Sequence, residues 1–85
     1  MYKVVISRSA EKELGGFSEN VLERVLKVKW KLEINPRPVC CKKLKGNDET
    51  LWRIRTGYHR IIYSINDKIL IVDIRKVGHR KDIYL

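Results

Sequence analysis

The chain has 85 residues, of which 44% are hydrophobic. This length suffices to bury roughly 60 to 65% of the unfolded surface, and the composition excludes a disordered chain. We therefore expect one domain that folds without disulfide bonds or a structural metal ion. Its 19 Lys and Arg against 10 Asp and Glu leave a formal charge of +9. That balance favours a polyanionic partner such as nucleic acid, an anionic membrane or an acidic protein.

Targeting and metal-binding signals are lacking in the sequence. The N-terminus has no signal-peptide core, and no apolar run approaches the ~20 residues of a membrane span. Cys40 and Cys41 are adjacent, so they are poorly placed to bridge each other, and no nearby Cys or His completes a metal site. We expect a cytoplasmic protein with reduced thiols, no membrane contact, no metal and no cofactor.

The first third of the chain predicts a strand and two helices. Residues 2–6 alternate as a short strand. Ser7 or Ser9 can cap a short helix that stops at Gly15-Gly16. Ser18 can cap a second helix, which Asn35-Pro36 ends because the residue before proline avoids helical geometry. Its apolar stripe is broad, as in a helix that packs on a core: Val21, Leu22, Val25, Leu26, Val28, Trp30, Leu32 and Ile34. We expect an αα-hairpin on one side of a sheet.

The segment 39–45 reads as a strand or an extended stretch with three lysines, Lys42, Lys43 and Lys45. Such a run is usually a solvated strand. Because this segment is next to the arginines described below, its lysines could also contact a nucleic-acid backbone.

Residues 51–65 predict a β-hairpin. A Gly-X pair is what a two-residue type II′ turn needs, so we place the turn at Gly57-Tyr58. Alternation then puts Trp52, Ile54, Ile61, Tyr63 and Ile65 on one face, and Arg53, Arg55 and Arg60 on the other. Like charges opposite each other destabilise a sheet, so we interpret the arginines as the footprint of an anion.

Asn66-Asp67 is expected to form a two-residue turn into a strand at 68–74. This register puts Leu70, Val72 and Ile74 on the helix-facing side and Asp73 opposite Arg60. An ordinary cross-strand ion pair is therefore an alternative role for Arg60. Ile62, Ile69 and Ile71 would lie on the cationic side.

The C-terminal stretch 77–85 is expected to begin with a loop at Gly78 and to take one helical turn, which brings Arg80 and Tyr84 side by side. RNA cleavage without a metal needs a base, positive charge on the phosphorane and a proton for the leaving oxygen. Tyr84 can be the base if neighbouring cations lower its pKa, and His79 is the more conventional base. Each residue also has an alternative structural role: Tyr84 can be a packing anchor, and His79 can be a turn residue.

Three motifs, 43–46, 51–63 and 78–84, resemble in order and spacing the RelE branch of the RelE/ParE toxin superfamily. The set Ser7, Ala10, Leu14 and the break at Pro36 fit too. The resemblance implies one RelE-like toxin domain over residues 1–85. Its expected fold is α+β: an N-terminal strand, an αα-hairpin packed on one face of a small, mainly antiparallel four-stranded sheet (β-α-α-β-β-β), and a short C-terminal helical turn.

The resemblance also implies an activity: the toxin of a type II toxin–antitoxin system, a metal-independent mRNA endoribonuclease that cuts in the ribosomal A site through attack by the 2′-hydroxyl. On this pattern Arg60 stabilises the transition-state phosphate, Arg80 assists the leaving oxygen and Tyr84 takes the 2′-hydroxyl proton. The RNA-binding set is Lys45, Arg53, Arg55 and His79. Arg53 and Arg55 stand where the family often has lysines, which keeps phosphate binding but not ready proton exchange.

The implied partner is a cognate RelB-type antitoxin with an acidic, otherwise disordered segment. Ile62, Ile69 and Ile71, or the helix hairpin, could receive it. The toxin would be monomeric alone and oligomeric through the antitoxin. Two alternatives stay open: a ParE-type protein that poisons DNA gyrase without hydrolysis, and an inactive relative that binds an antitoxin.

Overall fold

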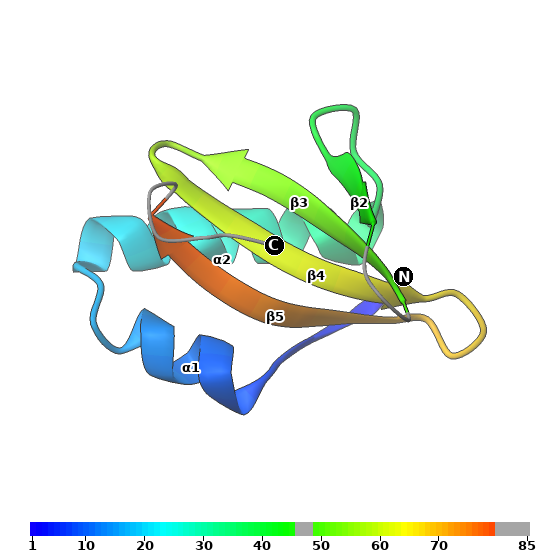
Figure 1. The fold of residues 1–85 in the computed structure, drawn as a ribbon, viewed down its shortest axis with the longest axis horizontal. Helices are drawn as coiled ribbons and strands as arrows, with labels where there is room; N and C mark the ends of the chain where they lie inside the picture. The colour runs from blue at the N-terminus through cyan, green and yellow to red at the C-terminus, as the bar shows by residue number, and fades with distance from the viewer. Residues whose placement is uncertain (46–48, 80–85) are drawn as a thin grey trace.

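A computed structural model describes residues 1–45 and 49–79. In chain order these residues form β1 (Lys3–Ile6), α1 (Arg8–Leu14), α2 (Glu19–Ile34), β2 (Lys42–Lys45), β3 (Thr50–Thr56), β4 (His59–Asn66) and β5 (Ile71–His79). The five strands make one sheet in the order β1-β5-β4-β3-β2, in which β1 runs parallel to β5 and the other neighbours are antiparallel (Figure 1). The expected α+β class is confirmed. The sheet has one strand more than expected, because residues 42–45 pair with β3.

The two helices begin where the sequence predicts. Ser7 caps α1 by accepting a hydrogen bond from the Ala10 N–H at 3.2 Å, and Ser18 caps α2 by accepting one from the Val21 N–H at 3.4 Å. Neither described helix has the length and apolar character needed to cross a membrane.

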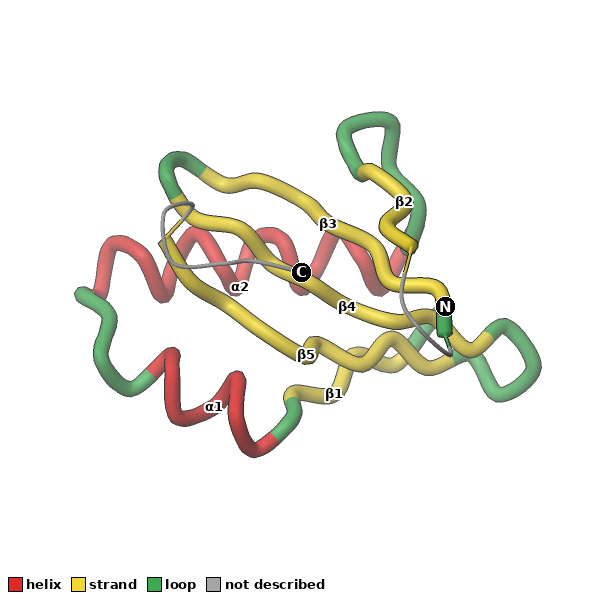
Figure 2. Tube along the Cα trace, in the orientation of Figure 1, coloured by secondary structure: helices red, strands yellow, loops and turns green. Residues whose placement is uncertain are grey.

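Both helices pack against the same side of the sheet. α2 lies behind β3 and β4, while α1 lies beside β5 (Figures 1 and 2). The core fills the space between the layers and consists of Val4, Ala10, Val25, Val28, Leu32, Ile54, Ile61, Tyr63, Val72, Ile74 and Val77. No helix formed by the described residues covers the opposite side, which we call the open face.

The buried apolar stripe of α2 is narrower than the sequence predicts. Val25, Val28 and Leu32 are buried, but Leu26, Trp30 and Ile34 are 47%, 58% and 75% exposed. A step of four residues advances by more than one turn of the helix, so this second row rotates away from the sheet. Its prediction as core is wrong for these three residues.

The central hairpin has the predicted register. Thr56 pairs with His59, Arg55 with Arg60, and Trp52 with Tyr63. Gly57 has φ +61°, the left-handed conformation that the first central residue of a type II′ turn requires.

The connection from β4 to β5 differs from the expected two-residue turn. Residues 67–70 form a longer loop, because the Asn66 side-chain oxygen accepts hydrogen bonds from the Lys68 and Ile69 N–H groups at 3.0 and 3.3 Å and holds an Asx-type turn. Leu70 is consequently 43% exposed instead of facing the helices. The longer loop also shifts the register, so that Asp73 lies opposite Ser64, not opposite Arg60.

A β-bulge interrupts the pairing of β4 with β5. Tyr63 pairs with Ile74 but Ile62 pairs with Lys76, which leaves Arg75 as the extra residue. Beyond the bulge β5 continues to His79, so the expected loop at Gly78 is wrong; Gly78 is a buried strand residue opposite Arg60.

Candidate functional site

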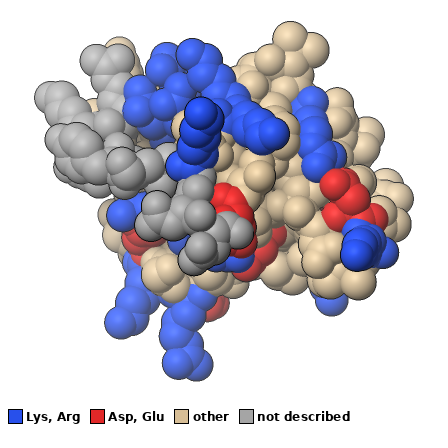
Figure 3. Space-filling view, turned by 45° about the vertical axis from the view of Figure 1, so that its right-hand side comes forward, with Lys and Arg blue, Asp and Glu red and all other residues tan. Residues whose placement is uncertain are grey.

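Five cationic side chains lie on the open face in two neighbouring rows. The first row crosses four strands as Lys42, Arg53, Ile62 and Lys76. The second row consists of Arg55, Arg60 and Gly78. We call Lys42, Arg53, Arg55, Arg60 and Lys76 the cationic face. In Figure 3, Lys and Arg side chains gather in the upper middle of the view and also lie at the lower left and at the right, while acidic side chains lie near the centre and at the right.

The arginines of the hairpin lie together as predicted. Arg55 and Arg60 are direct neighbours, and Arg53 precedes Arg55 by one alternation of the strand. Arg53 and Arg60 are half-buried and Arg55 is exposed. Guanidinium groups stay charged at any working pH and bind phosphate oxygens in pairs, so this arrangement suits a phosphodiester.

Two predicted RNA-binding residues lie elsewhere. Lys45 pairs with Thr50, and strand alternation puts both on the side opposite Arg53. His79 pairs with His59, on the helix side of the sheet. The structure therefore does not bring Lys45 and His79 to the arginines. It brings Lys42 and Lys76 instead: Lys42 belongs to the lysine run noticed in the sequence, while Lys76 depends on the bulge.

The two histidines belong to an aromatic cluster at the hairpin end of the sheet. Their ring centroids are 5.6 Å apart, and His59 also lies edge-on to Phe17 at 5.0 Å. Tyr58 stacks on His79 at 6.3 Å. Burial lowers the pKa of His59, and the nearby His79 and Arg24 lower it further. The cluster thus favours a neutral His59 that packs between the turn and the helices.

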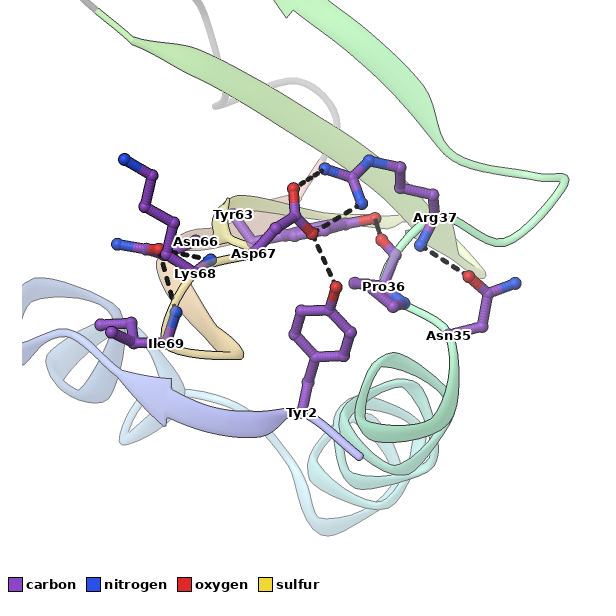
Figure 4. Close-up of polar contacts among 9 residues, drawn as sticks. All are labelled: Tyr2, Asn35, Pro36, Arg37, Tyr63, Asn66, Asp67, Lys68 and Ile69. Carbon is purple, nitrogen blue, oxygen red and sulfur yellow. Dashed lines mark hydrogen bonds and ion pairs between the residues drawn. The ribbon is translucent and has the colours of Figure 1, made fainter.

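The other end of the sheet is held by a polar network (Figure 4). Asp67 accepts hydrogen bonds from the Tyr2 hydroxyl at 2.6 Å and from two Arg37 nitrogens at 3.1 and 2.7 Å. These bonds lower the pKa of Asp67 to about 2. The Arg37 guanidinium also lies 5.2 Å from the centre of the Trp52 ring, and the buried Tyr63 hydroxyl donates to the Pro36 carbonyl at 2.8 Å.

A cleft of about 560 Å³ lies at this end of the sheet, with lining residues from β2, β3, β4 and β5. Its lining includes Trp52, Ser64, Ile71 and Asp73. Apart from Lys43, the charged groups that line it are paired with each other: Arg37 with Asp67, and Arg75 with Asp73 and Glu49. The lining of the cleft thus carries both signs of charge, whereas the cationic face consists of Lys and Arg side chains.

Some predicted features lie outside the described residues. Arg80, Tyr84 and the C-terminal helical turn fall in 80–85. Among residues 1–45 and 49–79, no group of three His, Cys, Asp or Glu side chains could hold a metal ion. Cys40 and Cys41 are free thiols.

The fold has counterparts among bacterial and archaeal toxins. A family model described as the ParE toxin of the type II toxin–antitoxin system, parDE, matches residues 4–84. The chain belongs to this family. No curated protein matches the sequence.

Solved structures with the same fold come from the RelE group. A chain of the archaeal RelE–RelB complex from Pyrococcus horikoshii OT3 is 31% identical, with a TM-score of 0.83 over 96% of this chain and 98% of that chain. A chain of the RelBE2 complex from Mycobacterium tuberculosis is 26% identical, with a TM-score of 0.78 over 93% and 98%. The isolated RelE toxin of E. coli, at 23% identity and a TM-score of 0.78 over 93% and 84%, shares the fold. The fold of this type II toxin is therefore RelE-like.

Proposed function

We propose that this toxin is a cytoplasmic, ribosome-dependent endoribonuclease that cuts mRNA in the A site, with residues 1–85 acting as one domain. The observation that carries the proposal is the gathering of Arg53, Arg55 and Arg60 on the open face of the sheet. A cluster of like charges costs stability, whereas a phosphodiester chain matches it.

The reaction needs no group beyond the side chains of the protein. The RNA 2′-oxygen attacks phosphorus, the bond to the 5′-oxygen breaks, and a 2′,3′-cyclic phosphate and a 5′-hydroxyl remain. Arg60 stabilises the charge that develops on the phosphorane oxygens. From outside the described residues, Tyr84 takes the 2′-hydroxyl proton, and Arg80 stabilises the leaving 5′-oxygen, which takes up a proton and becomes the 5′-hydroxyl. Arg53 and Arg55 hold the phosphates beside the scissile bond.

Lys45 and His79 have secondary roles in this proposal. They lie on the side of the sheet opposite the arginines, so they can contact only RNA or ribosomal RNA that passes the sheet edge. We propose for them a contribution to ribosome affinity rather than to the chemical step.

Purified ribosomes carrying a defined mRNA test the proposed reaction. We expect cleavage only when ribosomes are present, with products that end in a cyclic phosphate and begin with a 5′-hydroxyl. Equal cleavage of naked and ribosome-bound mRNA would contradict the ribosome dependence. Products with a 3′-hydroxyl would contradict attack by the 2′-oxygen.

We further propose a cognate RelB-type antitoxin with an acidic segment as the partner that keeps the toxin inactive. Support comes from the related chains, which were solved in RelE–RelB complexes, and from the charge of +9. Ile62 is only 2% exposed and does not offer a docking surface, but Ile69 is 62% exposed. On the helix hairpin, Leu26, Trp30 and Ile34 form an exposed apolar row.

The protein product of the neighbouring gene tests this partner. We expect it to co-purify with the toxin and to block mRNA cleavage. Light scattering after size-exclusion chromatography should show a monomer for the toxin alone and a larger complex with the antitoxin. A neighbouring gene product that neither binds nor neutralises the toxin would count against the proposal.

A second candidate is inhibition of DNA gyrase without hydrolysis. The family model that matches the chain is that of the ParE toxins, which favours this alternative. The sequence favours the nuclease, because the Gly78–Tyr84 motif carries the arginine and tyrosine that ParE-type proteins generally lack.

A further inference from the structure

We infer that Lys76 is an RNA-binding residue, and that the β-bulge at Arg75 turns it onto the open face so that the sheet holds two consecutive phosphates. This inference rests on the proposed function, because it names RNA as the polyanion. It adds to the predicted site a cation that strand alternation alone assigns to the core.

The bulge decides which way Lys76 points. Val72 and Ile74 face the core, so unbroken alternation would turn Lys76 inward and Val77 outward. The extra residue Arg75 reverses this order: Val77 is fully buried in the core, and Lys76 lies opposite the open-face residue Ile62. Bulges commonly re-aim a side chain in this way near functional sites.

Helix α1 holds the backbone on both sides of Lys76. The Arg75 carbonyl accepts hydrogen bonds from the Ser7 and Ser9 hydroxyls at 3.2 and 3.4 Å. The Val77 N–H donates to the Glu13 carboxylate at 3.2 Å. Both peptide groups next to Lys76 are thus held by hydrogen bonds from the helix side of the sheet. These bonds fix the backbone so that the Lys76 side chain points to the open face.

The Arg75 guanidinium is occupied and does not compete for RNA. It lies 2.8 Å from Asp73 and 2.8 Å from Glu49. Lys76, in contrast, forms no ion pair with another described residue and is half-buried. Its row neighbour Ile62 supplies an apolar floor over which a lysine stem can lie while the ammonium group stays in water.

The spacing of the two rows suits an extended RNA chain. Rows two residues apart are separated by about 6.8 Å along the strands, and neighbouring strands are about 4.8 Å apart. Arg55 and Arg60 therefore bind one phosphate, while Arg53 and Lys76 flank the next phosphate from β3 and β5. Such a basic track follows the backbone of a single strand without reading its bases.

Binding of a fluorescent single-stranded 2′-O-methyl RNA, which lacks the attacking hydroxyl, tests the inference across about 50 to 200 mM salt. For Lys76→Gln we expect the slope of log affinity against log salt to fall by about 0.7, the value for one phosphate contact on a single strand. Lys76→Arg should keep the wild-type slope. Lys27→Gln changes the net charge equally on the exposed side of α2, and Lys3→Gln removes a lysine opposite Ile71 on the distant edge of the sheet; both should keep the slope.

Equal slopes for Lys76→Gln, Lys27→Gln and wild type would overturn the inference, as would wild-type protein that does not bind the RNA at low salt. Urea unfolding of each variant distinguishes the loss of an RNA contact from the loss of the folded structure. A urea midpoint for Lys76→Gln as low as that of a Val77→Ala variant would also overturn the inference, because Lys76 would then support the core. The ribosome assay tests the proposed function independently of this binding assay. A reduced salt slope for Lys76→Gln without mRNA cleavage by wild type would contradict the nuclease proposal but keep Lys76 as an RNA contact.

Discussion

Arg60 lies opposite Gly78 across the β4–β5 pair, and Asp73 lies five residues earlier on β5, opposite Ser64. The carboxylate that the sequence suggests as an ordinary partner for Arg60 is bound to Arg75 instead, at 2.8 Å. The position opposite Arg60 on β5 is thus a glycine, Gly78, and not an acidic residue.

Asp73→Asn tests this separation of Asp73 from the cationic face. Because Asp73 makes a partly exposed ion pair with Arg75, its loss should cost less than about 1 kcal/mol of unfolding free energy. RNA affinity should not decrease, since the substitution removes a negative charge and leaves every residue of the cationic face in place. A loss of RNA affinity comparable with that of Arg60→Ala would contradict this view.

Glu13→Ala tests the anchoring of the bulge. It removes the acceptor of the Val77 N–H, which should lower the unfolding free energy by about 1 kcal/mol in urea titrations. Glu13→Gln makes the same change of charge but keeps an oxygen acceptor, so it should stay close to wild type. Equal losses for the two variants would mean that the charge, and not the hydrogen bond, matters.

Gly57→Ala tests the hairpin turn. The left-handed φ of +61° costs an L-residue about 1 to 2 kcal/mol, and a Cβ would also meet the end of the Arg24 side chain, which must move aside. Gly16→Ala is the matched control, since a Cβ there has its nearest neighbour at 3.7 Å and no left-handed φ. A midpoint in urea that falls as much for Gly16→Ala as for Gly57→Ala would contradict the turn assignment.

The Asp67 network predicts a pH dependence of stability. The pKa of Asp67 is about 2 in the folded protein and near 3.8 in the unfolded chain, so the unfolded state takes up the proton first as the pH falls. The stabilisation is therefore complete above about pH 4 and is lost as the pH falls through 2. The melting temperature of Asp67→Asn should lie below that of wild type at pH 5, and the gap should close toward pH 2. A gap that is the same at both pH values would exclude this linkage.

Local sequence signals were sufficient for most of the fold. Ser7 and Ser18 satisfy free N–H groups at their helix starts, and Gly57 supplies the conformation that fixes the hairpin register. These features depend on residues close in sequence, so pattern reasoning reaches them. The sequence did not predict that Leu26, Trp30 and Ile34 are exposed, because apolar character alone does not say which side of a helix meets the sheet.

The bulge could not be predicted from composition, because Arg75 has no property that marks an extra residue. Its stabilising contacts come from Ser7, Ser9 and Glu13, more than 60 positions earlier in the chain. One signal was present: the buried residues of β5 are spaced by two from Val72 to Ile74 and by three from Ile74 to Val77. That irregular step carries Lys76 to the cationic face and Gly78 to Arg60.

The central claim is that the arginine face acts on RNA, and mapping of RNA ends in a cell-free translation reaction tests it most directly. Wild type, Arg60→Ala and Tyr84→Phe are compared, with Lys27→Gln as the charge-matched control. The account predicts cuts inside A-site codons for wild type and Lys27→Gln that fade in the other two variants. Intact message in every reaction, together with gyrase-dependent DNA breaks, would contradict it and assign the cationic face to protein binding.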